Sequence, residues 1–408
     1  MTPTTQRHVQ TTAVHAGERI RREGFRTTST PIYNTATFLY DTAEALDAAF
    51  EADPSFVYAR HGNPTIAALE TALATLEGGV GTVAYACASG MAALHAAILA
   101  TGVAPGERIV ASRDLYGTTA ALLKNLFLGQ GYDVRFVDLG DHAAVDRALG
   151  EGDAQVLLAE TVSNPLLQVA DLPMLAALAH AHGAQLVVDA TFTPPTLLHP
   201  LALGADLVIH STTKYLSGHG DVLGGVILAG PQHDATLRSV TRLVGGAAGP
   251  QEAWLTLRGL KTLPLRFERQ CANATKIAAW LAAHPAIEAV HFPGLPGHPD
   301  HALAARLFGP AASAGEAPAF GAMLSFAIRD ANRARVFRFL DRLELCLPAT
   351  SLGDLYTLVA YPAMASHREL TPKERARVGI GDGLLRLSAG IEHVDDILAD
   401  LAGALGDE

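Results

Sequence analysis

Residues 185–215 of this chain read QLVVDATFTPPTLLHPLALGADLVIHSTTKY, and this stretch decides the fold. It holds two short apolar runs, at 185–189 and 206–209, in which apolar residues follow one another without alternation. Strands of this kind are buried on both faces, which is typical of a parallel sheet covered by helices. Polar residues stand at the end of each run, so polar side chains are expected where the strands end.

The same pattern extends outward in both directions from this stretch. Further strands are predicted at residues 82–86, 108–111, 134–137, 155–159 and 225–228. Helical patterns lie between most of them, for example at 64–76, 91–100 and 173–182. Strands that alternate with helices predict an α/β domain with a largely parallel sheet.

The chain on either side of this core has a different character. Residues 1–62 show weak periodicity and many Thr, Pro and Arg residues, which predicts an arm that must pack on something else. The α/β domain is expected to span 63–258, and a smaller α+β domain 259–408. The elements predicted in that last part are a helix at 259–283, a strand at 322–328, a helix at 332–340 and a strand at 384–388.

The composition excludes several classes of function. Hydrophobic residues make up 49% and charged residues 17% of the 408 residues, which indicates a globular protein. The net charge of −11 argues against binding to nucleic acid or to an anionic membrane surface. The three cysteines form no close pair and no HExxH motif occurs, so neither a disulfide framework nor a metal site is predicted.

One segment has the length of a membrane span. Residues 80–106 contain no Asp, Glu, Lys or Arg, but Ser89, Gly90 and His95 interrupt them and small residues dominate. The polar N-terminus also lacks the apolar core of a signal peptide. We therefore expect a cytoplasmic protein with no membrane partner.

The polar residues at the predicted strand ends suit one cofactor. Asp189 can pair with a protonated pyridine nitrogen, although an isolated carboxylate there can also cap a helix or bind a metal. Lys214 can form an imine with an aldehyde while the hydroxyls of Ser211 and Thr213 bind a phosphate, although a lysine at a strand end is often only a solvated charge. Together these groups indicate pyridoxal 5′-phosphate (PLP).

Residues 89–91 add a second phosphate-binding feature. Ser89-Gly90-Met91 lies between a predicted strand and a predicted helix, where glycine permits close approach and the free N–H groups of a helix start attract an anion. Small residues are common before helices, so this pattern is weak alone. A nucleotide is a poorer match, because the chain has no GxxxxGK[ST] motif.

Eight motifs follow one another along the chain: Tyr58-Ala59-Arg60, Ser89-Gly90-Met91, DLYG at 114–117, ETVSNP at 160–165, Asp189, STTKY at 211–215, Ser351-Leu352-Gly353 and Arg386-Leu387-Ser388. Taken in order, these motifs resemble the trans-sulfuration (Cys/Met metabolism) group of PLP enzymes, which includes methionine γ-lyase, cystathionine γ-lyase and O-acetylhomoserine sulfhydrylase. The resemblance runs from TPIYNTATF near Pro31 to RLSAGIE at Arg386 and implies the type I, aspartate aminotransferase-like fold.

The resemblance implies a role for each matching residue. Lys214 is the Schiff-base lysine and proton carrier, and Tyr116 stacks on the ring and acts as general acid at the leaving thiolate. The residues implied to bind the cofactor are Tyr58, Arg60, Ser89, Gly90, Met91, Tyr116, Asn164, Asp189, Ser211, Thr213 and Lys214. Those implied to bind substrate are Asn164, Ser351 and Arg386. From the residues alone, Asn164 can instead be a turn residue and Tyr116 a loop aromatic.

The resemblance also implies a homotetramer in which Tyr58 and Arg60 reach the phosphate of a neighbouring subunit.

Several positions depart from the family pattern and bear on the reaction. Val57 and Thr350 stand where the cystathionine enzymes usually carry Glu, which favours an apolar or neutral γ-substituent. Thr118 stands where methionine γ-lyases typically have Cys, and Ala190 and Thr212 replace the commoner Asn and Ala.

These features predict a methionine γ-lyase-like enzyme that acts on a sulfur amino acid. O-acetylhomoserine sulfhydrylase or another γ-substitution enzyme is the near alternative, and cystathionine γ-lyase is a further one. A PLP-binding protein without turnover belongs to a different class, and the presence of Lys214, Tyr116 and Arg386 argues against it.

Overall fold

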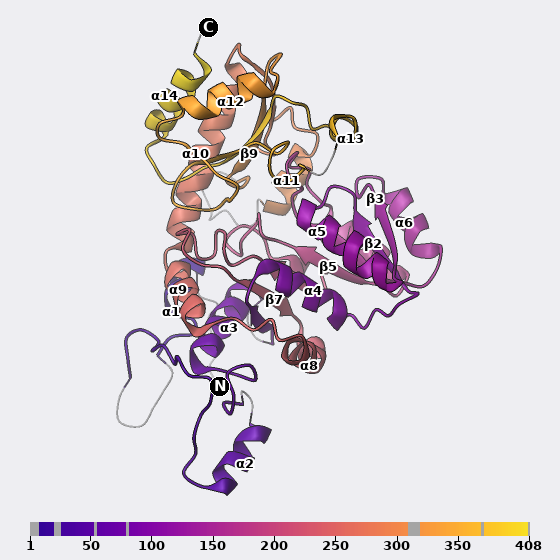
Figure 1. The fold of residues 1–408 in the computed structure, drawn as a ribbon, viewed down its shortest axis with the longest axis vertical. Coiled ribbons are helices and arrows are strands. Elements are labelled where there is room, and N and C mark those ends of the chain that lie inside the picture. The colour runs from indigo at the N-terminus through magenta and orange to yellow at the C-terminus, as the bar shows by residue number, and fades with distance from the viewer. Residues whose placement is uncertain are drawn as a thin grey trace.

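The computed structural model describes residues 8–19, 26–52, 55–78, 81–308, 319–368 and 371–406. Within them the strands form two sheets, of order β1-β7-β6-β5-β4-β2-β3 and β10-β11-β12-β9-β8. Figure 1 shows the small sheet above the large one, with the long helix α10 (Leu263–Ala283) rising beside both.

The large sheet contains every strand predicted for the α/β domain. Its strands are β1 (Val83–Cys87), β2 (Arg108–Ser112), β3 (Asp133–Val137), β4 (Ala154–Glu160), β5 (Gln185–Asp189), β6 (Leu207–His210) and β7 (Gly225–Ala229). Neighbouring strands from β3 through β6 pair in parallel, and β7 runs antiparallel to both β6 and β1. The prediction of a largely parallel sheet is confirmed, and the sheet places the carboxyl ends of its parallel strands along one edge.

Helices cover both faces of this sheet. They are α3 (Pro64–Glu77), α4 (Gly90–Ala100), α5 (Gly117–Leu122), α6 (His142–Gly150), α7 (Leu172–Ala181), α8 (Asp234–Val244) and α9 (Pro250–Leu260). Alternate residues of the strands enter different cores: Val187 and Ile209 pack with α4, whereas Val188 and Val208 pack on the face covered by α3 and α7. Burial on both faces explains why these strands lack polar alternation.

The small sheet is mostly antiparallel. Its strands are β8 (Ile287–His291), β9 (Met323–Ile328), β10 (Leu347–Pro348), β11 (Leu358–Ala360) and β12 (Leu384–Ser388). The helices around it are α11 (His301–Phe308), α12 (Arg333–Arg342), α13 (Pro372–Arg377) and α14 (Val394–Leu405). The predicted strands at 322–328 and 384–388 and the helix at 332–340 are confirmed, and one apolar core joins this sheet to one face of the large sheet.

The single helix predicted at 259–283 is wrong at its start. The structure has two helices there: α9 ends at Leu260, and α10 begins at Leu263 after Thr262. Pro264 lies in the first turn of α10, where its missing N–H removes no helical hydrogen bond. The periodicity of apolar residues continues across the break, so it did not reveal the boundary.

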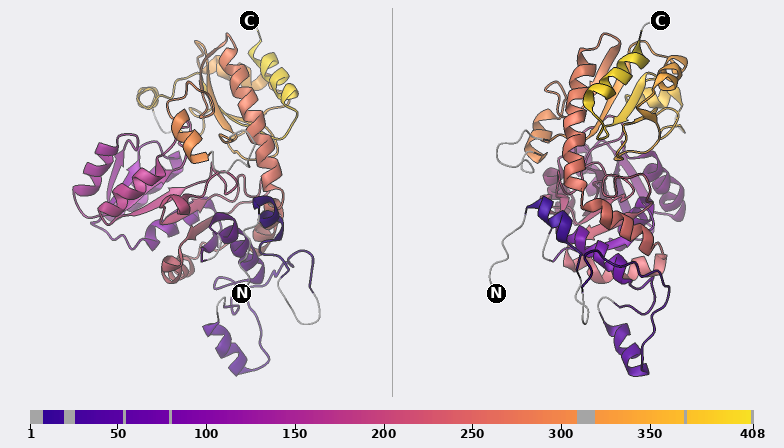
Figure 2. Two further views of the ribbon diagram at one scale, coloured as in Figure 1. Left: turned by 180° about the vertical axis from the view of Figure 1, so that it is seen from behind. Right: turned by 90° about the vertical axis from the view of Figure 1, so that its left-hand side faces the viewer.

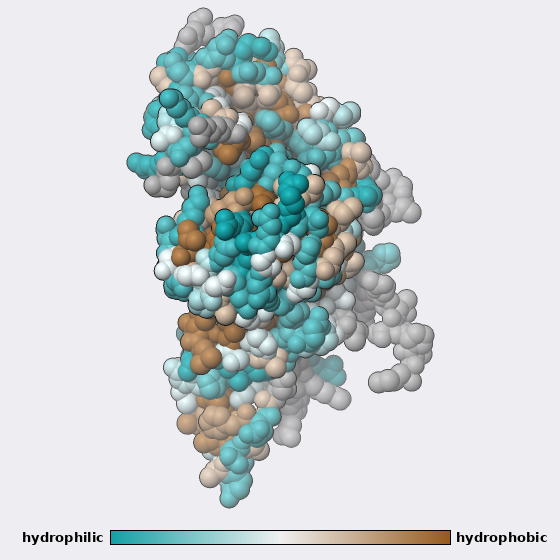
Figure 3. Space-filling view, turned by 90° about the vertical axis from the view of Figure 1, so that its right-hand side faces the viewer, coloured by the Kyte–Doolittle hydropathy of each residue, from teal (hydrophilic) through white to brown (hydrophobic). Residues whose placement is uncertain are grey.

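The N-terminal segment is only partly attached to the rest of the chain. Helix α1 (Val9–His15) packs on α3 and α10, but α2 (Ala43–Glu51) stands away from the body of the molecule in both views of Figure 2. Leu39 is 94% exposed and Phe50 56% exposed, and Figure 3 shows apolar surface at the lower end of the face it draws, where this arm lies. Among the described residues, no helix combines the length and apolarity that a membrane crossing requires.

Candidate active site

A cavity of about 230 Å³ opens where the carboxyl ends of the parallel strands meet. Open α/β sheets bind ligands at this edge because loops from several strands converge there. The predicted site residues that line the cavity are Ser89, Gly90, Met91, Tyr116, Asn164, Asp189, Ser211, Thr213, Lys214 and Arg386. Residues up to 297 positions apart in the sequence are thus brought together by the large sheet and by β12 of the small one.

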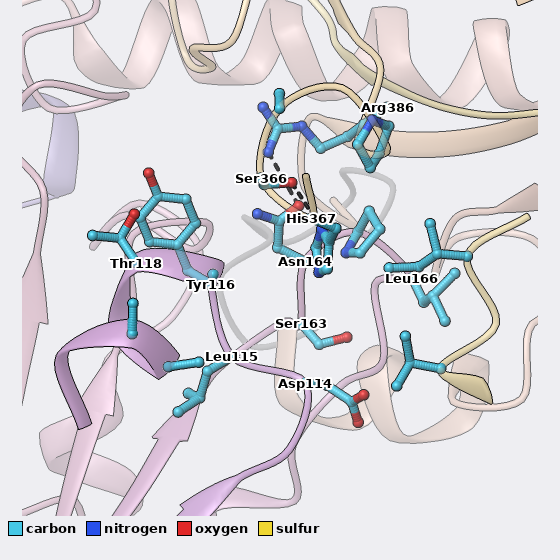
Figure 4. Close-up of a pocket in the computed structure, with 18 of the residues that line it drawn as sticks. Asp114, Leu115, Tyr116, Thr118, Ser163, Asn164, Leu166, Ser366, His367 and Arg386 are labelled. Carbon is cyan, nitrogen blue, oxygen red and sulfur yellow. Dashed lines mark hydrogen bonds between the residues drawn. The ribbon is translucent and has the colours of Figure 1, made fainter. Parts of the chain in front are cut away.

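A second and larger cavity, of about 920 Å³, adjoins the first. The two share Tyr116, Asn164, Thr350 and Arg386 in their walls. Figure 4 shows Tyr116 and Thr118 on one side of this larger space, with Asn164, His367 and Arg386 across from them. A ligand held in the smaller cavity therefore faces the larger one past Tyr116.

Lys214 follows strand β6 and projects its amine into the smaller cavity. Its Nζ donates a hydrogen bond to Ser351 Oγ at 2.8 Å, which joins the loop after β6 to the loop after β10. Burial, together with the nearby charge of Arg386, lowers the pKa of the Lys214 ammonium. A lowered pKa increases the fraction of neutral amine, which is the form that attacks an aldehyde.

Two carboxylates lie side by side at the ends of β4 and β5. Glu160 and Asp189 are register partners in the parallel pair, and burial raises the pKa of both carboxyls. Glu160 Oε1 accepts a hydrogen bond from Tyr116 N at 2.6 Å, and Asp189 Oδ1 accepts one from Thr191 N at 2.9 Å. A buried carboxylate is costly unless a cation balances it, and a protonated pyridine nitrogen beside Asp189 would supply that charge.

The start of α4 and the loop after β6 form a narrow cradle. Ser89 Oγ caps the helix by accepting from Ala92 N at 3.1 Å. A Cβ on Gly90 would lie 2.9 Å from Ser211 Cβ, so only glycine permits this approach of the two segments. Thr213 Oγ1 accepts from Gly224 N at 3.0 Å, which fixes its position. Hydroxyls facing a helix N-terminus fit a phosphate group.

Arg386 extends from β12 to the boundary between the two cavities, and it is 5% exposed. Nη1 donates to Asn164 Oδ1 at 3.1 Å and Nη2 to the Ser351 carbonyl at 3.1 Å. Burial lowers the pKa of the guanidinium to about 10, and Nε is buried without a hydrogen-bond partner among the described residues. A buried guanidinium held in one orientation suits a substrate carboxylate.

Two of the predicted cofactor residues do not reach either cavity in this chain. Tyr58 is 44% exposed, and Arg60 lies over its ring with Cζ 5.6 Å from the centroid. Arg60 Nη1 donates instead to the carbonyl of Arg242 at 2.8 Å, at the end of α8. Their expected contact with a neighbouring subunit's phosphate stays a prediction.

Sequence reasoning assigned no role to Glu160 or His367, although Glu160 begins the ETVSNP motif. Glu160 ends β4 as Asp189 ends β5, so its position at a strand end was the available signal. His367 lines the larger cavity, and its Nδ1 lies 2.9 Å from Ser366 Oγ. Burial and the charges of Arg386 and Arg375 lower the pKa of His367 to about 4, so its ring is neutral at neutral pH. No motif in the sequence distinguished it from the other histidines.

The geometry fits the cofactor predicted from the sequence. Three features face one cavity: an amine with a lowered pKa, a buried carboxylate at a strand end and a cradle at a helix start. These are the groups that PLP requires. The fold and the site together define a PLP-dependent enzyme.

Comparison with known proteins places the chain more narrowly. Residues 10–406 match the family described as Cys/Met metabolism PLP-dependent enzyme, and the chain belongs to this family. An L-methionine gamma-lyase of Fusobacterium nucleatum subsp. polymorphum is 40% identical over 97% of each chain. An O-succinylhomoserine sulfhydrylase of Pseudomonas aeruginosa is 38% identical over 97% of this chain and 94% of its own length.

A solved structure agrees with this placement. The cystathionine gamma synthase of Xanthomonas oryzae pv. oryzae, in complex with cystathionine, superimposes with a TM-score of 0.89 at 39% identity, over 99% of this chain and 98% of that chain. The family and the type I fold predicted from the motifs are therefore confirmed. Its members are carbon–sulfur lyases and γ-substitution enzymes that act on small amino acids.

Proposed function

We propose that this chain is a carbon–sulfur lyase that cleaves L-methionine by γ-elimination, with methanethiol, 2-oxobutanoate and ammonia as products. The observation that carries the proposal is Thr350, a neutral side chain in the wall shared by both cavities. A substrate whose carboxylate lies at Arg386 directs its γ-substituent past Thr350 into the larger cavity. A neutral side chain at this point suits a thioether, and the relative at 40% identity is named as a methionine lyase.

The residues of the smaller cavity hold the cofactor and the common part of the substrate in this proposal. Asp189 holds the ring nitrogen, and Ser89, Gly90, Met91, Ser211 and Thr213 hold the phosphate. Arg386 and Asn164, already hydrogen-bonded to each other, bind the α-carboxylate. Ser351 Oγ accepts a hydrogen bond from Lys214 Nζ at 2.8 Å and so orients the free amine for proton transfer.

Two side chains move protons. Bound PLP withdraws electrons from the bonds at the substrate's α- and β-carbons. Lys214 removes the proton from the α-carbon, a task for which its lowered pKa provides a neutral amine. A second proton is then lost from the β-carbon, and this loss supplies the electron pair that expels the γ-substituent. Tyr116 lies between the two cavities and donates a proton to the sulfur that leaves from the γ-carbon. Arg386 keeps the substrate fixed during both steps.

One observation favours a second function. Arg113 and Lys124 line the larger cavity, and two cations there suit a γ-substituent that ends in a carboxylate, such as a succinyl ester. The O-succinylhomoserine sulfhydrylase relative at 38% identity has a name that fits this chemistry. Arg113 is already paired with Asp138 at 2.8 Å, which reduces its availability. γ-Substitution on an acylated homoserine is therefore the alternative, ahead of cystathionine cleavage.

The proposed assembly is a homotetramer of two dimers with shared active sites. Tyr58 and Arg60 lie on the exposed arm, outside both cavities of their own chain, and the apolar surface of the arm suits burial against another subunit. In this assembly they contact the phosphate in the partner's site.

The deciding experiment measures 2-oxobutanoate release from L-methionine by the PLP-loaded protein. The Lys214→Ala variant is the blank, and Lys276→Ala, which removes an exposed lysine of α10, is the matched control. Release that depends on Lys214 but not on Lys276 supports the lyase. No release, together with homocysteine formation from O-succinylhomoserine or O-acetylhomoserine and sulfide, would replace it with γ-substitution. Protein that binds PLP but turns over none of these substrates would indicate a non-catalytic binder.

A further inference from the structure

Arg386 has a neighbour on the small sheet that also reaches the active-site loop. Ser325 on β9 is the register partner of Arg386 on β12, so their side chains lie on the same face of the sheet. Ser325 is fully buried and its Oγ donates a hydrogen bond to the carbonyl of Pro165 at 2.7 Å. Arg386 Nη1 donates to Asn164 Oδ1 at 3.1 Å. The paired residues Ser325 and Arg386 of the small sheet therefore hold two consecutive residues of the loop after β4.

The hydrogen bond from Ser325 holds the loop at Pro165, a residue that cannot donate a main-chain hydrogen bond of its own. Proline has no N–H, so its carbonyl is the main-chain group through which this part of the loop can be held. The loop is otherwise closed on itself on either side of Pro165, where Ser163 N donates to the Gln168 carbonyl at 2.9 Å and Leu167 N donates to the Ser163 carbonyl at 3.1 Å. Val169 N donates to Asp300 Oδ2 at 3.0 Å, which fixes the far end of the loop. Loss of the Ser325 bond therefore frees the segment beside Asn164 while the rest of the loop stays attached.

We propose that Ser325 is a positioning residue for substrate binding, which fixes the Asn164 amide and through it the direction of the Arg386 guanidinium. Arg386 is held on one side by Asn164 and on the other by the Ser351 carbonyl. A shift of Asn164 changes the first of these bonds and turns the guanidinium away from the substrate carboxylate. Ser325 lines neither cavity, so its effect reaches the ligand through Pro165, to which it is bonded, and through Asn164 and Arg386.

The inference rests on the proposed role of Arg386 in binding the α-carboxylate. The test therefore compares a ligand that has this carboxylate with one that lacks it. L-Norleucine has the chain length of methionine without a leaving group, and L-norleucine amide replaces its carboxylate by a neutral amide. The readout is the dissociation constant of each, taken from the change in cofactor absorbance of the PLP-loaded protein, and it requires no turnover.

Ser325→Ala is expected to weaken norleucine binding about tenfold, the size of one good hydrogen bond, and to leave the affinity for the amide unchanged. Ser325→Thr keeps the hydroxyl and should restore the wild-type preference. Thr256→Val is the matched control: Thr256 is equally buried, and its Oγ1 donates to the Glu252 carbonyl at 2.8 Å within α9, outside the site. Thermal midpoints of all variants report any general loss of stability.

The outcomes separate this inference from the proposed site. An equal loss of affinity for both ligands in Ser325→Ala, or the same behaviour in Thr256→Val, would mean that Ser325 supports only the fold. Arg386→Gln, measured in parallel, tests the carboxylate role by itself. If Arg386→Gln loses the preference for norleucine and Ser325→Ala retains it, the positioning role is wrong and the site assignment stands. If Arg386→Gln retains the preference, the site assignment itself is wrong.

Discussion

The cofactor cavity and the N-terminal arm both carry predicted site residues, but they differ in what the chain provides for them. In the cavity, Asp189, Lys214 and Arg386 come from three strands or their ends and line one space, and Ser351 of the same chain accepts hydrogen bonds from both Lys214 and Arg386. On the arm, Tyr58 and Arg60 are exposed and contact each other and α8. A sheet brings distant residues together because strand pairing fixes their register. The arm pairs with itself, at the bridge between Thr37 and Tyr58, and we expect a second molecule to give its residues a function.

The largest expected effect tests this difference directly. Arg60→Ala should weaken PLP binding roughly 10–100-fold, because it removes charge-assisted hydrogen bonds to the phosphate in the partner's site. Mixing Arg60→Ala with Lys214→Ala subunits should restore about a quarter of wild-type activity, since half of the random dimers are mixed and each then has one intact site. The measurement is 2-oxobutanoate release after the two variants are dissociated and reassembled.

The matched control uses two residues of the cavity. Asp189 and Lys214 both line the cavity of one chain, so Asp189→Asn mixed with Lys214→Ala leaves every site defective and should give no rescue. If the Arg60 mixture also shows only the sum of its parents' activities, the arm has no role in a partner's site. Equal rescue in both mixtures would show that the cavity, too, is shared between subunits.

The sequence was informative where side chains follow strand periodicity. The continuous apolar runs predicted each strand of the large sheet, and polar residues at their ends, such as Asp189, led to the cavity. It was not informative where a property arises from packing. The pKa of His367 is lowered by burial and by Arg386 and Arg375, which lie elsewhere in the sequence. The hydroxyl of Ser325 gains its contact from a loop 160 residues away.

A smaller effect concerns the pH dependence of stability within the cavity. Because the pKa of His367 falls from 6.5 to about 4 on folding, the unfolded chain binds this proton more readily than the folded protein between those pH values. The contribution of His367 to the free energy of unfolding is therefore complete above pH 6.5 and is lost as the pH falls toward 4. After allowance for the partial exposure of the ring, the loss is about 2 kcal/mol.

Denaturant titrations of the PLP-loaded protein at pH 7 and pH 4 measure this loss in the free energy of unfolding. His367→Asn should lose about 2 kcal/mol less than wild type between the two pH values, because asparagine does not titrate. Thr118→Ala changes the lining of the same cavity without removing a titrating group and should keep the wild-type difference. If His367→Asn and wild type lose the same free energy, the ring is not held neutral by its surroundings.

The smallest effect concerns Thr350, the neutral residue on which the choice between the candidate substrates was based. Thr350→Glu places a carboxylate where both cavities meet, and it should raise the ratio of kcat/KM for L-cystathionine over L-methionine about fivefold, as expected for one partly exposed ion pair with the distal ammonium. Thr350→Gln has nearly the same shape without the charge and should leave the ratio close to wild type. If both variants shift the ratio equally, size and not charge controls selection, and Thr350 does not favour a neutral γ-substituent. A shift with Glu alone would instead show that substrate choice depends on the charge at this position.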